Sequence, residues 1–444
     1  MNQFIKNSPL LQGLLFSVAT ATLTTSTLLA PSFHRSAQAE LKDSPKAIVD
    51  EVWQLVNREF VDKNFNQSDW QATRRELLSR DYTSYEEAYR AIREALTPLN
   101  DPYTRFLEPK EFELLTSQTS GEMSGIGIRL EIDDKTKVLT VVEPIENSPA
   151  IAAGIKAGDK ILAIDGKPTS LMTIEQASEH IRGETGTEVR LKLSRSGQEP
   201  FEVTLTRAQI ELPTVRYTLR EDNGIQVGYI KLNEFSSHAA EQMERAIEAL
   251  KQQDADAFVL DLRGNPGGLL YASIDIARMW MEDGDIVRTV DRRGGDRYFK
   301  ANHTALTNLP LAVLVDENSA SASEILAGAL KDNKRATIIG TNTFGKGKVQ
   351  SVHSLSDGSG LAVTISRYYP PSGIDINHRG ITPDIQVDLT GEQQVRLSTN
   401  PTLFGTPADP QYSRAISVLK TNPISQESPQ QLGEALGQNL PNVR

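Results

Sequence analysis

Two apolar runs in the second half of the chain are separated by one stretch with helical spacing. Leu311–Val315 is a short, continuous apolar run, which is typical of a strand buried on both faces. Ser323–Leu330 follows with apolar residues at helical spacing, and Ala336–Gly340 is the second apolar run. This order of strand, helix and strand predicts part of an α/β core.

The same pattern extends over residues 208–392. Gly228–Leu232 and Ala257–Leu262 predict two more strands, and His238–Gln252 predicts an amphipathic helix between them. Further strands are expected over Ser359–Tyr368. Residues 208–392 are therefore expected to fold as one α/β domain.

The preceding chain divides into two regions of different texture. Residues 40–115 have helical periodicity, with helices expected at Asp69–Ser79 and Tyr85–Ala95. Residues 116–207 instead show five short strand patterns and one longer helix, Thr173–Ile181. The chain is thus predicted to have a multidomain α+β fold, in which the helical region only packs or dimerises.

The first 39 residues have the order of a secretory signal. Lys6 supplies the positive start, Leu10–Leu29 is moderately apolar, and small residues before Glu40 form a cleavage site. A retained membrane anchor is the second interpretation, although threonines and serines dilute the apolar segment. The mature protein is expected to work outside the cytoplasm.

The composition and net charge exclude several classes of partner and cofactor. The chain has 444 residues, 38% of them hydrophobic, and a net charge of −11, which argues against a nucleic-acid partner. It has no cysteine, and its six histidines lack ligand spacing, so no disulfide, metal or cofactor is expected. Residues 393–444 are predicted to form a polar tail, partly disordered from Pro401 onward.

Three serines, Ser319, Ser321 and Ser323, stand between the strand and the helix described first. A serine at such a turn can point its oxygen into a cleft, beside the unpaired N–H groups and positive dipole end of the helix. That position suits a nucleophile. Ser321 and Glu324 also fit a capping box, so a purely structural role is a second interpretation.

Lys346 is flanked by Gly345 and Gly347, which predict a tight backbone path that presents the lysine at a fixed place. The segment from Gly340 to Lys346 matches most of a phosphate-binding P-loop. However, Gly347 stands where the motif needs Ser or Thr, and strand-like residues follow in place of a helix. Nucleotide binding is therefore not expected.

The runs SASASEILAGALKDNKRA and TFGKGKVQ resemble the active-site signature of the carboxyl-terminal processing peptidases, which are serine peptidases with a Ser/Lys dyad. The resemblance implies that Ser321 is the nucleophile, Lys346 the general base and Gln350 the residue that orients it. It also implies an oxyanion hole made by the backbone N–H groups of Gly268 and Ala322. The implied core has a crotonase-like or Clp-protease-like fold.

A lysine acts as a base only when it is neutral, so its pKa must fall from about 10.4 toward neutrality. Burial without a carboxylate partner has that effect. Thr343, Phe344 and the two glycines are expected to supply such a pocket. Gln350 can hydrogen-bond the amine without adding charge.

The run SPAIAAGIKAGDKILAIDGKP resembles the centre of a PDZ domain. The resemblance places Gly125, Ile126, Gly127 and Ile128 in the carboxylate-binding loop. In that fold a peptide adds as a strand to a sheet edge, and backbone N–H groups receive its C-terminal carboxylate. Ile126 and Ile128 are expected to line the pocket for the last side chain; a plain tight turn is the alternative.

Together these resemblances imply an extracytoplasmic serine endopeptidase that captures protein C-terminal tails and removes them through an acyl-enzyme. VDKNFN and DPYTRFLEP resemble the branch of oxygenic phototrophs most closely. That branch implies maturation of the photosystem II reaction-centre precursor in the thylakoid lumen, and hence clients associated with a membrane.

Three alternatives remain open. The first is a tail-specific protease for quality control of other periplasmic or lumenal proteins. The second is a non-catalytic PDZ scaffold. The third is a Ser–His–Asp triad in which His353 serves Ser321, with Asp357 or Asp375 behind it.

Overall fold

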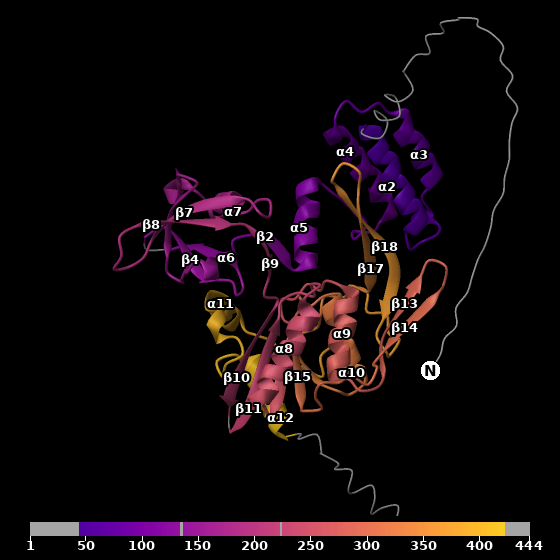
Figure 1. Ribbon diagram of the computed structural model, residues 1–444. Helices are drawn as coiled ribbons and strands as arrows, with labels where there is room; N and C mark the ends of the chain where they lie inside the picture. The colour runs from indigo at the N-terminus through magenta and orange to yellow at the C-terminus, as the bar shows by residue number, and fades with distance from the viewer. Residues whose placement is uncertain (1–43, 134–135, 223, 422–444) are drawn as a thin grey trace, which may run out of the picture. The chain divides into compact units, whose positions relative to one another are not determined.

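The computed structural model describes residues 44–133, 136–222 and 224–421 (Figure 1). These residues form a helical region, a small β domain and an α/β core, each with its own cluster of buried apolar side chains. The signal-like residues 1–39 and the last part of the polar tail lie outside the described residues. Within the described part, no helix is both long and apolar enough to cross a membrane.

The helical region is built around two stacked tryptophans, Trp53 and Trp70, whose ring centroids are 6.3 Å apart. Its elements are α2 (Pro45–Glu59), the 3-10 turn Phe65–Gln67, α3 (Trp70–Ser79), α4 (Tyr85–Leu96), the 3-10 turn Thr97–Leu99, β1 (Arg105–Leu107) and α5 (Pro109–Ser120). Asp69 and Ser84 cap α3 and α4 by accepting backbone N–H groups. The apolar cluster of this region also contains Leu361 of the core, so the two share buried surface.

The small β domain is an antiparallel sheet with the strand order β3-β4-β5-β7-β8. Its elements are β3 (Ile128–Ile132), β4 (Leu139–Pro144), α6 (Pro149–Ala152), β5 (Lys160–Ile164), β6 (Lys167–Pro168), the 3-10 turn Thr169–Leu171, α7 (Ile174–Ile181), β7 (Glu188–Ser194) and β8 (Phe201–Thr206). Alternate residues of β7 are buried, as expected for a sheet with one covered face. Strand β3 lies at an edge. Strands β2 (Glu122–Gly125) and β9 (Ala208–Glu211) pair with each other beside this domain.

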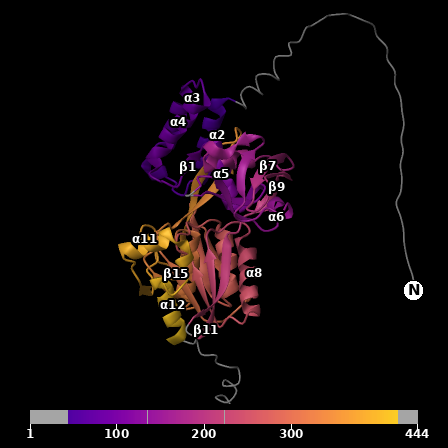
Figure 2. The same ribbon diagram turned by 90° about the vertical axis from the view of Figure 1, so that its left-hand side faces the viewer.

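The core contains a six-stranded sheet that is parallel except for its edge strand β10. Its strands are β10 (Val215–Asp222), β11 (Ile225–Leu232), β12 (Ala257–Asp261), β15 (Leu311–Val315), β16 (Thr337–Gly340) and β19 (Ile385–Gln386). Helices α8 (Ala239–Gln252), α9 (Leu270–Trp280) and α10 (Ala322–Asp332) pack on one face, and α12 (Pro410–Thr421) packs on the other. Figure 2 shows α8 and α12 on opposite sides of the sheet. Because both faces are covered, β12 and β15 are buried throughout, and β15 is apolar over its whole length.

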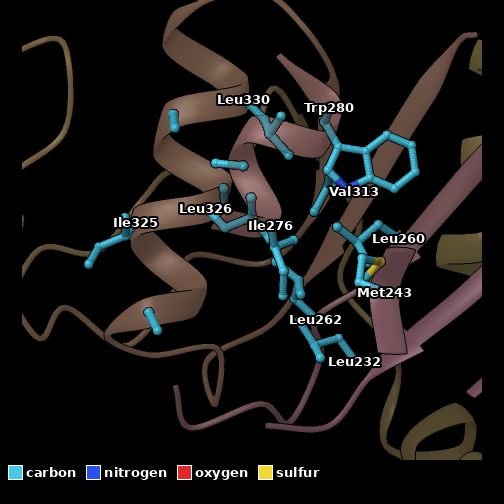
Figure 3. Close-up of a cluster of buried hydrophobic side chains, with 14 of the residues drawn as sticks. Leu232, Met243, Leu260, Leu262, Ile276, Trp280, Val313, Ile325, Leu326 and Leu330 are labelled. Atoms are coloured by element: carbon cyan, nitrogen blue, oxygen red, sulfur yellow. The ribbon is translucent and has the colours of Figure 1, made fainter. Parts of the chain in front are cut away.

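The side chains between this sheet and its three helices form the largest apolar cluster (Figure 3). Trp280 of α9 lies over Phe258 of β12 with ring centroids 5.2 Å apart. Leu326 and Leu330 of α10 reach the same cluster, so the helix that begins at Ser321 is anchored along one side. This packing fixes the position of the first turn of α10.

A second sheet carries the segment that follows Lys346. Its strands are β1, β13 (Asp285–Asp291), β14 (Asp296–Lys300), β17 (Lys348–Ser354) and β18 (Gly360–Tyr369). Strand β1 of the helical region pairs with β18, with Arg105 opposite Ala362. Strand β17 pairs with β18 as well, with an irregularity between Val349 and Gln350. The helical region and the lysine segment are thus joined to the same strand.

The polar tail is more ordered than its composition suggests. Within residues 393–444, the structure contains the end of α11 (Gly391–Thr399), the 3-10 turn Pro401–Leu403, and α12, whose Tyr412 is buried against the sheet. The expected disorder is therefore wrong for α12, because its few apolar residues are spaced to form one buried stripe. Residues 422–444 lie outside the described residues.

Candidate active site

Ser321 lies at the start of α10, after the turn that leaves β15. Its two neighbours in the serine run are fully buried, and both donate their hydroxyls to main-chain carbonyls. Ser319 Oγ is 2.9 Å from the Leu262 oxygen, and Ser323 Oγ is 2.9 Å from the Asn265 oxygen. These two serines fix the turn, and Ser321, which is half-buried, is the one placed as a nucleophile would be.

The backbone of Ser321 is strained. Its φ of 55° and ψ of −112° fall in a region that L-residues rarely adopt, at a cost on the order of 1–3 kcal/mol. The Ser321 N–H donates to Glu324 Oε2 at 2.8 Å, and the Ser321 carbonyl accepts from the buried Tyr368 hydroxyl at 3.1 Å. The capping interpretation is thus correct for Glu324, and it is compatible with a catalytic role for Ser321.

Glu324 joins the serine turn to the lysine turn. Its buried carboxylate accepts four hydrogen bonds. Oε1 receives the Thr343 hydroxyl at 2.6 Å and the Gly345 N–H at 2.7 Å. Oε2 receives the N–H groups of Ser321 at 2.8 Å and of Lys346 at 2.9 Å. One oxygen atom therefore positions the main chains of both dyad candidates.

Tyr368 makes a second connection between the same two turns. Its hydroxyl contacts the main-chain carbonyl of Lys346 as well as that of Ser321. The sequence motif contains neither this tyrosine nor any sign that Glu324 reaches the lysine. Both contacts depend on how distant segments fold back together, so neither could be found from spacing alone.

The electrostatic surroundings of Lys346 favour a neutral amine. Burial lowers the pKa of Lys346, and the positive charge of Arg105 lowers it further. The negative charges of Asp101 and Glu324 act in the opposite direction, yet the pKa of Lys346 remains below that of a free lysine. The direction is the one that a general base requires.

The group that covers the amine differs from the expected one. The ring of Phe344 is 55% exposed and so does not bury the lysine. Instead, Lys346 Nζ lies 4.9 Å from the ring centroid of Tyr103, which belongs to the turn before β1. The interpretation of residues 40–115 as a packing module without chemistry is therefore incomplete.

Gln350 lies on β17, four residues after Lys346 in the sequence. Its side-chain nitrogen donates to Thr364 Oγ1 at 3.3 Å. With its nitrogen held there, the amide oxygen is the end of the side chain left to accept from an amine.

The glycine-rich turn after β12 lies against the start of α10. A Cβ added to Gly267 would come within 2.9 Å of Ser321 Cβ and 3.0 Å of the Ala322 nitrogen. Gly268 has a φ of 140°, and a Cβ there would lie 2.4 Å from the Phe235 oxygen. The turn that contains Gly268 therefore packs against Ser321 and Ala322 through the neighbouring Gly267.

Buried polar side chains hold this turn. Asn265 Oδ1 accepts the Gly267 N–H at 2.9 Å. Arg263, which is 5% exposed, pairs with Asp261 at 2.6 Å and with Asp409 at 2.7 Å. The last contact ties the segment before α12 to the turn. Sequence reasoning missed Arg263 and Asp409, although an arginine directly after an apolar strand is a signal of a buried pair.

The glycine loop of the β domain leads into the edge strand β3. Gly127 has a φ of 78°, and a Cβ added to it would lie 2.2 Å from Ser148 Cβ, so the loop is tight. Ile126 is 1% exposed and belongs to the core of the domain. The prediction that the Ile126 side chain lines an open pocket is therefore wrong, while Ile128 is only partly buried.

The alternative triad is not assembled. His353 Nε2 lies 2.7 Å from Glu59 Oε2 of α2, and Asp357 accepts the Tyr89 hydroxyl at 2.7 Å. Asp375 is exposed. The Lys346 turn runs into strand β17 and not into a helix, which also contradicts the P-loop alternative. In the part of the chain that the structure describes, no His, Cys, Asp and Glu side chains cluster as a metal site.

Comparison with known proteins shows the family to which the chain belongs. The model of peptidase family S41 matches residues 226–387, and a PDZ domain model matches residues 140–195. A carboxyl-terminal-processing protease of Synechocystis sp. is 44% identical over 369 residues, covering 83% of this chain and 85% of the relative. The chain belongs to the carboxyl-terminal-processing proteases. It is a serine peptidase of family S41 that carries a PDZ domain.

Other carboxyl-terminal-processing proteases are similar over most of the chain. The chloroplastic carboxyl-terminal-processing peptidase 2 of Arabidopsis thaliana is 43% identical over 346 residues, covering 75% of this chain and 67% of the relative. A solved photosystem II D1 C-terminal processing protease is 36% identical, with a TM-score of 0.52 over 83% of this chain and 99% of that one. The predicted family, fold class and enzyme class are confirmed.

Proposed function

We propose that this carboxyl-terminal-processing protease cleaves proteins near their C-terminal tails with Ser321 as nucleophile and Lys346 as general base. The observation that carries the proposal is the shared contact of both residues with Glu324 Oε2. The lowered pKa of Lys346, caused first by burial, supports it because the neutral amine is the form that removes a proton.

In the proposed reaction, the neutral amine of Lys346 takes the hydroxyl proton as Ser321 Oγ attacks the scissile carbonyl. The N–H groups of Gly268 and Ala322 stabilise the negative oxygen of the tetrahedral intermediate. The C–N bond then breaks, and the Lys346 ammonium gives its proton to the leaving amine. Water attacks the resulting ester with Lys346 again as base, which releases the new C-terminus and restores Ser321.

Gln350 has an orienting role in this proposal. Its side-chain nitrogen donates a hydrogen bond to the Thr364 hydroxyl, so its side-chain oxygen is the atom that would accept a hydrogen bond from the Lys346 amine. A neutral amide can hold the amine without the charge that would raise its pKa. A glutamate at this position would favour the protonated, inactive lysine.

The PDZ domain is proposed to capture the tail. Strand β3 is at the edge of its sheet, and the tight loop Gly125–Ile128 leads directly into it. A peptide can therefore add to β3 as a strand, with its carboxylate received by backbone N–H groups of the loop. Ile126 contributes its main chain only, because its side chain is buried.

The proposed client is the precursor of the photosystem II reaction-centre protein, cut in a thylakoid lumen or periplasm. The proposal is supported by the 36% identity to a solved photosystem II D1 C-terminal processing protease and by relatives in a cyanobacterium and a chloroplast. The signal-like composition of residues 1–39 supports export.

The test uses the mature chain, Glu40–Arg444, and a model protein that ends in an apolar tail. The parent should cut the free-acid form, and Ser321→Ala should cut nothing. Amidation of the tail should raise KM, because the loop then receives no carboxylate. Equal kinetics for acid and amide would remove the capture role, and tail binding without cleavage by the parent would favour a scaffold. The reaction-centre precursor, compared with an unrelated lumenal protein, tests the client.

A further inference from the structure

A second buried carboxylate, besides Glu324, lies near Lys346. Asp101 is 7% exposed and precedes β1 of the helical region. Its negative charge raises the pKa of Lys346, which opposes the action of that lysine as a base. The active site therefore needs some feature that stops Asp101 from pairing with Lys346.

Lys348 provides such a feature. Its Nζ lies 2.7 Å from Asp101 Oδ1, and its side chain is only 18% exposed. Lys346 and Lys348 are two residues apart on extended chain, so their side chains can point to the same side. Both in fact approach the same ring: Nζ of Lys346 is 4.9 Å, and Nζ of Lys348 5.5 Å, from the Tyr103 centroid.

We propose that Lys348 is a positioning residue that keeps Lys346 neutral. Its ammonium occupies the Asp101 carboxylate, which would otherwise pair with Lys346. The inference rests on the proposed role of Lys346 as general base. It extends that role to the helical region, which supplies both Asp101 and Tyr103.

The remaining contacts of Asp101 agree with an ionised carboxylate. Burial raises the pKa of Asp101, but hydrogen bonds from Lys348, Thr364 and Thr104 lower it by more. Thr104 Oγ1 is 2.7 Å from Asp101 Oδ2. Because β1 pairs with β18, the turn that holds Asp101 is fixed independently of the ion pair.

Four other groups act on Lys346 from the elements around it. Arg105 lowers the pKa of Lys346, and Glu324 raises it while its oxygens are engaged by four donors. Tyr103 and Tyr368 are neutral, since burial raises the pKa of both phenols. Glu324 is thus held by four donors, whereas the ion pair of Asp101 depends on one side chain, Lys348.

The test is the pH dependence of kcat/KM for the parent, Lys348→Met, Asp101→Asn and the double variant. The acid limb of this profile reports deprotonation of the base in the free enzyme. In Lys348→Met the limb should move to higher pH by about one unit, with about tenfold lower activity below it and recovery at alkaline pH. In Asp101→Asn it should move to lower pH. In the double variant it should return close to that of the parent.

Lys331→Met is the matched control. Lys331 is also partly buried, 29% exposed, and pairs with Asp384 at 3.1 Å on the far end of α10. The acid limb of the kcat/KM profile of Lys331→Met should stay at the parental pH. A Lys348→Met variant that loses activity equally at every pH, or keeps the parental limb, would show that Lys348 is merely structural and would overturn the inference.

Two variants, Asp101→Asn and the additional Lys346→Met, distinguish the possible reasons for a negative result. If Lys348→Met does not fold, Asp101→Asn decides the matter, because an unmoved limb there also overturns the inference. Lys346→Met tests the underlying function. If Lys346→Met is inactive and the acid limb of Lys348→Met stays at the parental pH, only the role of Lys348 is refuted. If Lys346→Met is active, the Ser321–Lys346 dyad is refuted as well.

Discussion

Replacing Glu324 by glutamine tests whether one buried carboxylate holds the serine and lysine turns together. The change keeps the size of the side chain but converts one acceptor oxygen into an NH₂ donor. If Oε2 is converted, the N–H groups of both Ser321 and Lys346 lose their acceptor. If Oε1 is converted, the Thr343 hydroxyl, which already accepts the Ile381 N–H, can rotate to accept a second hydrogen bond, and the Gly345 N–H is the one backbone donor that loses its acceptor. The second orientation of the glutamine amide costs less free energy, so the variant should adopt it, and the expected loss of stability is calculated for it.

An unpaired buried N–H costs about 1–3 kcal/mol, and the bonds that remain lose the strength that the negative charge gave them. The expected loss in the free energy of unfolding is about 2–4 kcal/mol. In a domain of this size that corresponds to a decrease of roughly 5–10 °C in Tm. Because the turns lose their common anchor, kcat should also fall while KM changes little.

The assays are thermal unfolding, followed by tryptophan fluorescence, and steady-state cleavage. Glu317→Gln is the matched control: Glu317 is an exposed glutamate of the same turn that accepts from Thr341 Oγ1 at 3.2 Å. It should change stability by less than about 0.5 kcal/mol. A Glu324→Gln variant with parental Tm and parental kcat would refute the bridging role of this carboxylate.

Three further predictions follow from the same geometry. Ser321→Gly should be more stable than Ser321→Ala by about 1–2 kcal/mol in chemical denaturation, because glycine tolerates a φ of 55°; equal stability would show that the turn is unstrained. Asp409→Asn should cost about 3 kcal/mol by removing a buried partner of Arg263, whereas the exposed control Asp388→Asn should cost little. Since burial lowers the pKa of Lys346, cleavage should rise with pH and level off below about pH 10.4, and a rate that falls over that interval would contradict the assignment.

Some of the fold could be predicted because periodicity is a local property. The buried strand Leu311–Val315 and the helix after it appear where their apolar spacing predicts them. The amphipathic helix α12 was missed because composition hides a stripe of few apolar residues. Strand β1 was missed because its three residues gain their partner only from the distant β18.

The candidate site likewise has residues that the sequence predicts and contacts that only the folded structure reveals. The motif predicts Ser321 and Lys346 as the dyad, since the chemistry needs those residue types and their spacing is distinctive. The motif does not show that Tyr103 covers the amine or that Asp101 is held by Lys348. These contacts come from the pairing of the helical region with the core, which leaves no local periodicity in the sequence.

The most direct test of the Ser321–Lys346 dyad is the rate at which a serine-directed phosphonylating probe modifies the purified chain. Peptide mass spectrometry then locates the modified residue. The account predicts labelling of Ser321, at a rate that rises with pH as Lys346 loses its proton. It also predicts no labelling of a folded Lys346→Arg variant, because guanidinium stays charged. Labelling of another serine, or of Ser321 at the parental rate in Lys346→Arg, would contradict it.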